Sequence, residues 1–165
     1  MSVRPEYDLE AYIKRSTEGP CFVCAFLGGH PDYRHHLVYE DEETVAFLTR
    51  YPTLLGYTVV CPRRHLESWV TDMEVDEFLR FQGTVHRVAR ALEATLPTER
   101  MYSMSLGSRQ GNAHLHWHLA PLPPGVPYRE QQFHAVMSEN GTLAVTDGSQ
   151  AALAREIRGR IDVGY

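Results

Sequence analysis

The sequence has no apolar run near its start, no excess of positive charge and only three cysteines, and each shortage excludes a class of protein. Residues 1–20 are largely polar, so we expect neither a signal peptide nor a membrane anchor and place the chain in the cytoplasm. Lys and Arg number 16 against 21 Asp and Glu, and the net charge of −5 argues against nucleic acid as a partner. A reducing cytosol disfavours disulfides, so the Cys-x-x-Cys pair of Cys21 and Cys24 predicts a metal or redox site.

The length and the spacing of the apolar runs predict one α+β domain. A chain of 165 residues fits a single domain, 1–165, with its core at about residues 21–121 and a C-terminal extension at about residues 122–165. Short runs rich in β-branched and aromatic residues, bounded by turn residues, predict an antiparallel meander of about five strands. These strands are expected at residues 37–40, 44–49, 56–62, 101–106 and 113–121.

A long amphipathic helix is predicted between the third and fourth strands. Apolar residues from Val75 to Leu96 follow the helical period of 3.6 residues. Thr71 and Glu74 match a capping box at the start of this helix, and Pro97 ends it. We expect the helix to pack on the sheet. The C-terminal extension is expected to form about two short helices, with one apolar stripe of Leu153, Ile157 and Ile161.

The stretch "NAHLHWHLAP" places three histidines, His114, His116 and His118, at every second position. Alternate residues of a strand share one face and lie ~6.6 Å apart along it, so neighbouring imidazoles can converge on one ion or one ligand. Burying three imidazoles for structure alone would leave many ring nitrogens in need of partners. The pattern therefore favours a functional role, and one such role is a metallohydrolase, which would need a third ligand from elsewhere and an open coordination position for water.

The histidine stretch, the upstream run "VYEDEETVAFLTRYPTLLGYTVVCPRRHLES" and "CFVC" together resemble the histidine triad (HIT) superfamily. The motif of that family is His-x-His-x-His followed by two apolar residues, and the resemblance covers roughly residues 21–121. It implies a HIT-like fold and a homodimer that pairs through the long helix and a strand. It also implies a nucleotide substrate, either a dinucleoside polyphosphate or a nucleoside phosphoramidate, that is cleaved at its α-phosphate.

The resemblance assigns the chemistry to the last two histidines. His116 becomes the nucleophile, which attacks the α-phosphorus and forms a nucleotidyl-histidine that water then hydrolyses. His118 contacts the phosphate oxygens, and Gln110 holds a non-bridging oxygen. A hydrolase or nucleotidyl transferase is therefore expected. The alternatives are a non-catalytic, zinc-stabilised nucleotide-binding module and a hydrolase in which zinc activates water.

Substrate-binding residues follow from the same resemblance. Gly107 and Gly111 let the backbone of their loop approach the phosphate, and Asn112 closes that loop. Phe47 and Leu48 are candidates for the base pocket, although strand alternation allows only one of them to face it. Family members often carry, at the position of Thr49, an Asp that holds the ribose hydroxyls. The binding candidates are therefore Phe47, Leu48, Thr49, Gly107, Gly111 and Asn112.

The Cys-x-x-Cys pair needs two more ligands if it binds zinc. A thioredoxin-like redox site would need a βαβ context, which the pattern does not show. The resemblance supplies the missing ligands, so that Cys21, Cys24, His65 and His114 hold zinc as a cofactor. The first histidine of the triad then serves the metal, while the second performs the chemistry.

Overall fold

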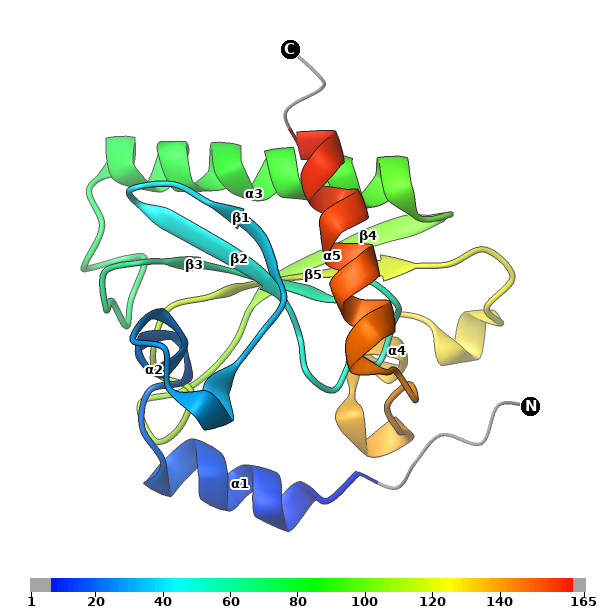
Figure 1. The fold of residues 1–165 in the computed structure, drawn as a ribbon, viewed down its shortest axis with the longest axis horizontal. Coiled ribbons are helices and arrows are strands. Elements are labelled where there is room, and N and C mark those ends of the chain that lie inside the picture. Colours follow the sequence, from blue (N-terminus) through cyan, green and yellow to red (C-terminus); the bar gives the residue numbers. More distant parts are fainter. Residues whose placement is uncertain (1–6, 162–165) are drawn as a thin grey trace.

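The computed structural model describes residues 7–161, which form a five-stranded antiparallel sheet covered by helices (Figure 1). The α+β class is confirmed. The strands are β1 (Leu37–Glu40), β2 (Thr44–Leu48), β3 (Thr58–Pro62), β4 (Arg100–Ser105) and β5 (Trp117–Leu122). The α-helices are α1 (Leu9–Glu18), α2 (Phe22–Leu27), α3 (Val75–Thr95), α4 (Phe133–Val136) and α5 (Asp147–Ile161). Short 3-10 turns lie at Pro31–Tyr33, Tyr128–Glu130 and Ser138–Asn140.

The strand order in the sheet is β1-β2-β3-β5-β4. The first three strands follow the expected meander, whereas a strict meander would place β4 beside β3. The reason lies in α3, whose 21 residues span about 31 Å and carry the chain across the sheet before β4 begins. The last four residues of β5 are buried, while no residue of β4 is, so β5 belongs in the interior and β4 at the edge.

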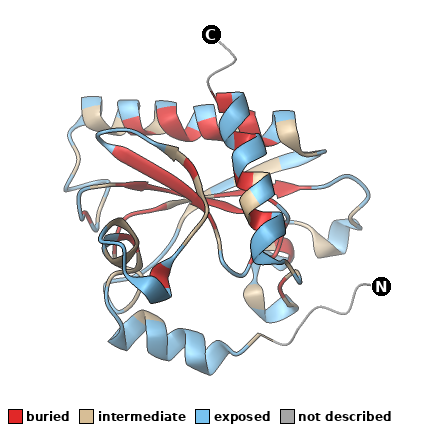
Figure 2. Cartoon of the chain, in the orientation of Figure 1, coloured by how far each residue is buried: buried red, intermediate tan, exposed pale blue. Residues whose placement is uncertain are grey.

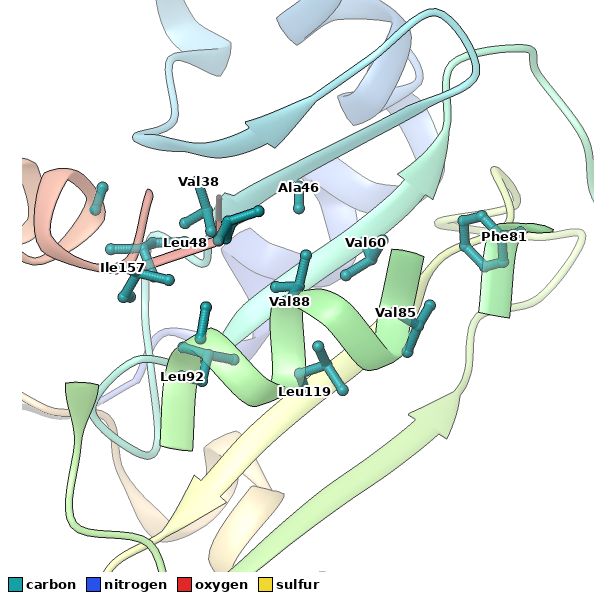
Figure 3. Close-up of a cluster of buried hydrophobic side chains, with 13 residues drawn as sticks. Val38, Ala46, Leu48, Val60, Phe81, Val85, Val88, Leu92, Leu119 and Ile157 are labelled. Carbon is teal, nitrogen blue, oxygen red and sulfur yellow. The ribbon is translucent and has the colours of Figure 1, made fainter. Parts of the chain in front are cut away.

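The alternation of the central strands divides the interior into two layers. Ala46, Leu48 and Val60 face α3 and α5, where Val88, Leu92 and Ile157 complete the main core (Figure 3). Their neighbours face α2, in a second cluster made of Val23, Val45, Phe47, Val59 and Cys61. Every residue of β2 and β3 is therefore buried (Figure 2). The functional residues described below lie on the α2 side.

The predicted capping box of α3 is wrong. Glu74 is the N-cap residue, but its side chain makes no capping hydrogen bond. The hydroxyl of Thr71 donates instead to Asp72, whose carboxylate also accepts from the backbone N–H groups of Glu67 and Ser68. Thr71 is therefore held by the loop before the helix. The helix ends at Thr95, two residues before Pro97.

Strand β5 begins later than expected, at Trp117, so the segment of His114 and His116 lies outside the ladder. The pairing of β3 with β5 ends at Val60 opposite Trp117. Beyond that point the backbone N–H of Leu115 donates to the carbonyl of Leu66 at 2.6 Å. The polar contacts of the two histidines, described below, hold the same segment. Irregular backbone therefore presents the first two triad histidines.

The C-terminal extension forms one short helix, α4, and one longer helix, α5. Ile157 and Ile161 are buried against the main core and Leu153 packs beside them, which confirms the predicted apolar stripe. Among residues 7–161, no helix is both long enough and apolar enough to span a bilayer.

The structure predicts that truncating a side chain to Ala lowers the free energy of unfolding more in the main core than at an exposed position. Val88 is fully buried between α3 and the sheet, so Val88→Ala should lower the free energy of unfolding by about 2–3 kcal/mol, through lost apolar burial and a residual cavity. Ile13→Ala removes more atoms but lies at an exposed site on α1, so it should cost less than about 1 kcal/mol. Urea unfolding of both variants measures the difference, and equal losses would contradict this view of the core.

Candidate active site and metal centre

A cavity lies on the α2 side of the sheet and is lined by residues of α1, α2 and the central strands. Its wall is mainly aromatic, with Phe22, Tyr33, His35, Phe47, Tyr57, His116 and His118. Polar side chains complete the wall, among them Arg15, Ser16, Thr49, Arg50, Thr53 and Asn112. An apolar wall with a few convergent polar groups is typical of a small-molecule site.

The four predicted metal ligands lie together beside this cavity. Each of the four residues offers one ligand atom, and these four atoms all lie within 4.8 Å of one another. They are Sγ in Cys21 and Cys24 and a ring nitrogen in His65 and His114. The Sγ–Nδ1 distances are 3.4 Å from Cys21 to His114 and 3.5 Å from Cys24 to His65. Zn–S bonds of about 2.3 Å and Zn–N bonds of about 2.05 Å place S and N about 3.6 Å apart in a tetrahedron. The donor set therefore fits a tetrahedral zinc ion.

Both histidines of this cluster are oriented for the metal by their other ring nitrogen. His114 Nε2 donates to the carbonyl of Pro62 at 2.7 Å, which leaves Nδ1 as the unprotonated ligand atom. Burial lowers the pKa of His114 to about 4, so the ring is neutral at pH 7. His65 Nε2 lies 3.3 Å from a carboxylate oxygen of Glu67. Such outer contacts fix the tautomer and the ring orientation of metal-binding histidines.

His116 is held in one tautomer by the backbone. Its Nδ1 lies 2.6 Å from the carbonyl oxygen of His114, and because a carbonyl only accepts, Nδ1 carries the proton. The other nitrogen, Nε2, is then unprotonated and has a free lone pair, and His116 is among the residues that line the cavity. Burial lowers the pKa of His116, which keeps the ring neutral. A Cβ atom on Gly107, whose φ is +106°, would lie 3.2 Å from the His116 ring and 2.5 Å from the carbonyl oxygen of Asn112.

His118 stands beside His116, with the ring centroids 4.7 Å apart. Its Nδ1 contacts the hydroxyl of Tyr57 at 3.1 Å, while Nε2 is buried without a partner among the described residues. Burial, together with the nearby His116, lowers the pKa of His118 to about 3. Burial also raises the pKa of Tyr57 to about 12, so its hydroxyl keeps its proton. Two neutral imidazoles therefore stand side by side in the cavity wall.

The structure brings some of the predicted binding residues to the cavity and not others. Phe47, Thr49 and Asn112 line it, but Leu48 does not, because it lies on the opposite face of β2 in the main core. Gln110 is exposed and is not among the lining residues. Gly111 instead lies against α1, where a Cβ atom would approach the Ser16 carbonyl oxygen to 3.2 Å.

The sequence did not predict that residues of helix α1 line the cavity. Tyr12, Arg15 and Ser16 of α1 all line it, and the hydroxyl of Tyr12 accepts a hydrogen bond of 2.7 Å from the side chain of Asn112. Helix α1 is amphipathic in sequence, but none of its residues is buried, so its apolar stripe did not reveal that the helix covers a cavity. His35, stacked on Phe47 at 4.4 Å, was also missed. The signals in the sequence were weak helical character around residues 9–13 and the two tyrosines of residues 7–20, neither of which indicated a cavity.

Comparisons with known proteins agree with this geometry. A family model described as HIT domain matches residues 31–124. An HIT-like protein of Mycobacterium tuberculosis (strain H37Rv) is 32% identical over 107 residues, which cover 64% of this chain and 72% of that protein. The structure of a hypothetical histidine triad nucleotide-binding protein from Sulfolobus tokodaii superposes with a TM-score of 0.69 at 23% identity, covering 86% of this chain and 92% of that one. The structure of a Zn-bound histidine triad family protein from Mycobacterium smegmatis superposes with a TM-score of 0.65 at 23% identity, and the match covers 86% of this chain and 92% of that one.

The expected resemblance is thus confirmed on three levels: the sequence motif, the fold of the sheet with its long helix, and the match of the family model over more than half of the chain. The chain belongs to the histidine triad (HIT) family.

Proposed function

We propose that this protein is a nucleotide hydrolase or nucleotidyl transferase that works through a covalent intermediate on His116. The observation that carries the proposal is the unprotonated Nε2 of His116 in the wall of an aromatic cavity, with its tautomer fixed by the His114 carbonyl. The substrates are nucleoside phosphate derivatives, either dinucleoside polyphosphates or nucleoside phosphoramidates. Membership of the HIT family supports this class of ligand.

The reaction has two steps. In the first step His116 Nε2 attacks the α-phosphorus, so that a P–N bond forms and the bond from phosphorus to the leaving group breaks. The leaving group departs with its electron pair and takes up a proton. Water, or another acceptor, then attacks the phosphorus, the P–N bond breaks, and a nucleoside monophosphate or its transfer product is released. The imidazole gains positive charge as the P–N bond forms. The carbonyl of His114, 2.6 Å from Nδ1, stabilises that charge.

His118 handles the phosphate oxygens. In the proposed tautomer the ring proton of His118 is on Nε2, and Nδ1 accepts from the hydroxyl of Tyr57, 3.1 Å away. This Nε2–H group, buried and without a protein partner, donates to a non-bridging oxygen of the α-phosphate. Gly107 lets the backbone of the 106–111 loop approach the same phosphate. Gly107, Gln110 and Gly111 are not among the residues that line the cavity, so their contact with the phosphate would require this loop to close over a bound substrate.

Zinc acts as a structural clamp held by Cys21, Cys24, His65 and His114. The Zn-bound relative from Mycobacterium smegmatis supports this identity of the metal. All four corners of the tetrahedron are filled by protein donors, which is the pattern of a structural site, whereas a catalytic zinc keeps one position open for water. The zinc-activated-water alternative is therefore disfavoured.

The protein acts as a homodimer that extends the sheet at β4. This strand is an edge of the sheet, and an unpaired edge offers its backbone groups to a second copy. Trp69 lies near that edge, 6.2 Å from Trp117, which pairs with Ser105 of β4. Exposed apolar side chains gather around Trp69 and the start of α3 and include Val70, Val75 and Leu79. Trp69 also stacks on Phe78 of α3, which joins it to the exposed side chains at the start of that helix, and exposed apolar residues at a sheet edge favour an interface.

The zinc proposal predicts about one zinc ion per chain in protein purified without chelators. Cys21→Ser should lose the metal and lower the melting temperature by several degrees or more, because metal binding contributes directly to folding free energy. Cys61→Ala is the control, since Cys61 is buried in the apolar cluster against which Cys21 packs but is not itself one of the four candidate ligands. Metal analysis and thermal unfolding measure both effects. Native protein that neither carries nor rebinds zinc would refute the proposed structural zinc site.

The covalent mechanism predicts that His116→Asn lowers turnover by about four orders of magnitude or more, since the bond to the nucleophile forms only during the reaction. Nucleotide binding should survive. His86→Asn, at an exposed position on α3, should leave turnover unchanged. Substrate labelled at the α-phosphate, quenched under alkaline conditions because the histidine P–N bond is acid-labile, should leave label on His116 in peptide maps. Label on His118, or near-normal turnover in His116→Asn, would overturn the mechanism.

The dimer is tested by light scattering after size-exclusion chromatography. The native protein should have the mass of two chains, and the double variant Val75→Glu, Leu79→Glu should have the mass of one, because it buries charge in the apolar patch. Ile13→Glu, an apolar-to-charge change on α1, should remain a dimer. A monomeric native protein at micromolar concentration would contradict the proposed assembly.

A further inference from the structure

Two arginines stand at the rim of the cavity without a carboxylate partner. Arg15 of α1 and Arg50, which follows β2, both donate to the same backbone carbonyl oxygen, that of Asp32, at 2.5 and 3.0 Å. Arg15 also lies 4.1 Å above the ring of Tyr33. Among residues 7–161, neither guanidinium is in an ion pair with an acidic side chain. Two like charges that share one neutral acceptor form a site ready for an anion.

Two hydroxyl groups beside these arginines also lack partners. Thr49, next to Arg50 in the chain, and Thr53 both line the cavity, and the Oγ1 atom of each is buried without a hydrogen bond in the described structure. The residue Thr53 is only 2% exposed. Buried hydroxyls without partners are costly and rare. Their place in the cavity wall indicates that a ligand supplies the missing oxygen acceptors.

These groups lie at the end of the cavity remote from the proposed chemistry. A row of rings runs from His116 to Phe22 (5.3 Å), to Phe47 (6.3 Å) and to His35 (4.4 Å). Both guanidiniums contact the Asp32 carbonyl and Arg15 lies over Tyr33, three residues and two residues before His35 in the chain, which places the arginines near the His35 end of the row. Burial, with a smaller contribution from the two arginines, lowers the pKa of His35 to about 4. The nucleoside lies along this aromatic row if the α-phosphate is at His116. The arginines then face the nucleoside and not the phosphate under attack.

The composition of the cavity wall defines the kind of group that the arginines hold. Free ribose hydroxyls are typically held by an Asp or Glu carboxylate, whereas a phosphate on the ribose is held by Arg. Among the described residues, the wall contains Arg15 and Arg50 but no Asp or Glu. The leaving group offers no alternative source of the anion, because in-line attack by His116 places it opposite the nucleophile, away from the nucleoside.

We propose, on the basis of the nucleotide-cleaving function above, that the substrate of this protein is a nucleotide with an additional phosphate on its ribose. Arg15 and Arg50 bind that phosphate at the rim, and the hydroxyls of Thr49 and Thr53 donate to the ribose phosphate and its neighbouring oxygens. The cavity thus has two anion sites, one at His116 and His118 and one at the paired arginines. Nucleotides with unmodified ribose occupy only the first.

Isothermal titration of the full-length, zinc-loaded protein tests this with three probes: AMP, adenosine 2′,5′-bisphosphate and adenosine 3′,5′-bisphosphate. At least one bisphosphate should bind about tenfold or more tightly than AMP, a ratio that corresponds to about 1.4 kcal/mol. The double variant Arg15→Gln, Arg50→Gln should bind all three probes with similar affinity. Lys14→Gln, which removes the same charge from the neighbouring position of α1 outside the cavity wall, should keep the ratio.

The outcomes separate this proposal from the one on which it rests. Native protein that binds AMP as tightly as both bisphosphates overturns the ribose-phosphate site and leaves the proposed hydrolase intact. A bisphosphate preference that persists in the double arginine variant also overturns it. Diadenosine triphosphate serves as a further probe. If its binding depends on the two arginines while bisphosphate binding does not, the arginines contact a polyphosphate chain, and the proposed ribose-phosphate site is wrong. Absence of binding by every nucleotide overturns both proposals together.

Discussion

His114 makes bonds in three directions, and the rest of the site depends on them. Its Nδ1 faces the thiols of Cys21 and Cys24, its Nε2–H donates to the Pro62 carbonyl, and its own carbonyl accepts from His116 Nδ1. The first contact completes the metal cluster, the second attaches the segment to the end of β3, and the third selects the tautomer of His116. A single residue therefore links the stability of the cluster to the state of the neighbouring imidazole, because displacing its ring also displaces the carbonyl that His116 needs.

Burial keeps the histidines of this site neutral at physiological pH. Desolvation penalises the charged form of an imidazole, and no carboxylate contacts His116 or His118 in the described structure to offset that penalty. A neutral ring retains a free lone pair on one nitrogen and a donor on the other, which is the combination that phosphorus chemistry at neutral pH requires. The aromatic wall, with Phe22 against His116, thus controls the protonation of the rings as well as the shape of the cavity.

The sequence allowed the elements and the metal ligands to be predicted, because both depend on local patterns and a family motif. The limits of β1, β2 and α3 fell within one or two residues of expectation, and the four candidate metal ligands converge although they are far apart in the chain. Other features depend on tertiary contacts that no local pattern encodes. Leu48 and Phe47 are both apolar and both buried, because β2 is covered on each face, so alternation alone could not say which of them meets the cavity.

The start of β5 and the position of α1 over the cavity were not predicted, because both depend on tertiary contacts. Alternating residues read as a strand from position 113, but the side-chain contacts of His114 and the Leu115–Leu66 bond remove that segment from the ladder. Helix α1 has no buried residue, so hydrophobic periodicity could not assign it a packing partner. Only in three dimensions do Tyr12 and Arg15 meet residues of the cavity that are distant in sequence.

The absence of buried residues in α1 also has a kinetic meaning. Lifting this helix away from the cavity returns little apolar surface to water and breaks a small set of polar contacts, such as the Tyr12–Asn112 hydrogen bond, so its local opening requires less free energy than opening of the doubly covered central strands. A ligand that engages Arg15 adds its own contacts to this weak attachment, so it stabilises α1 in its position over the cavity, and local opening of the helix becomes rarer while the ligand is bound.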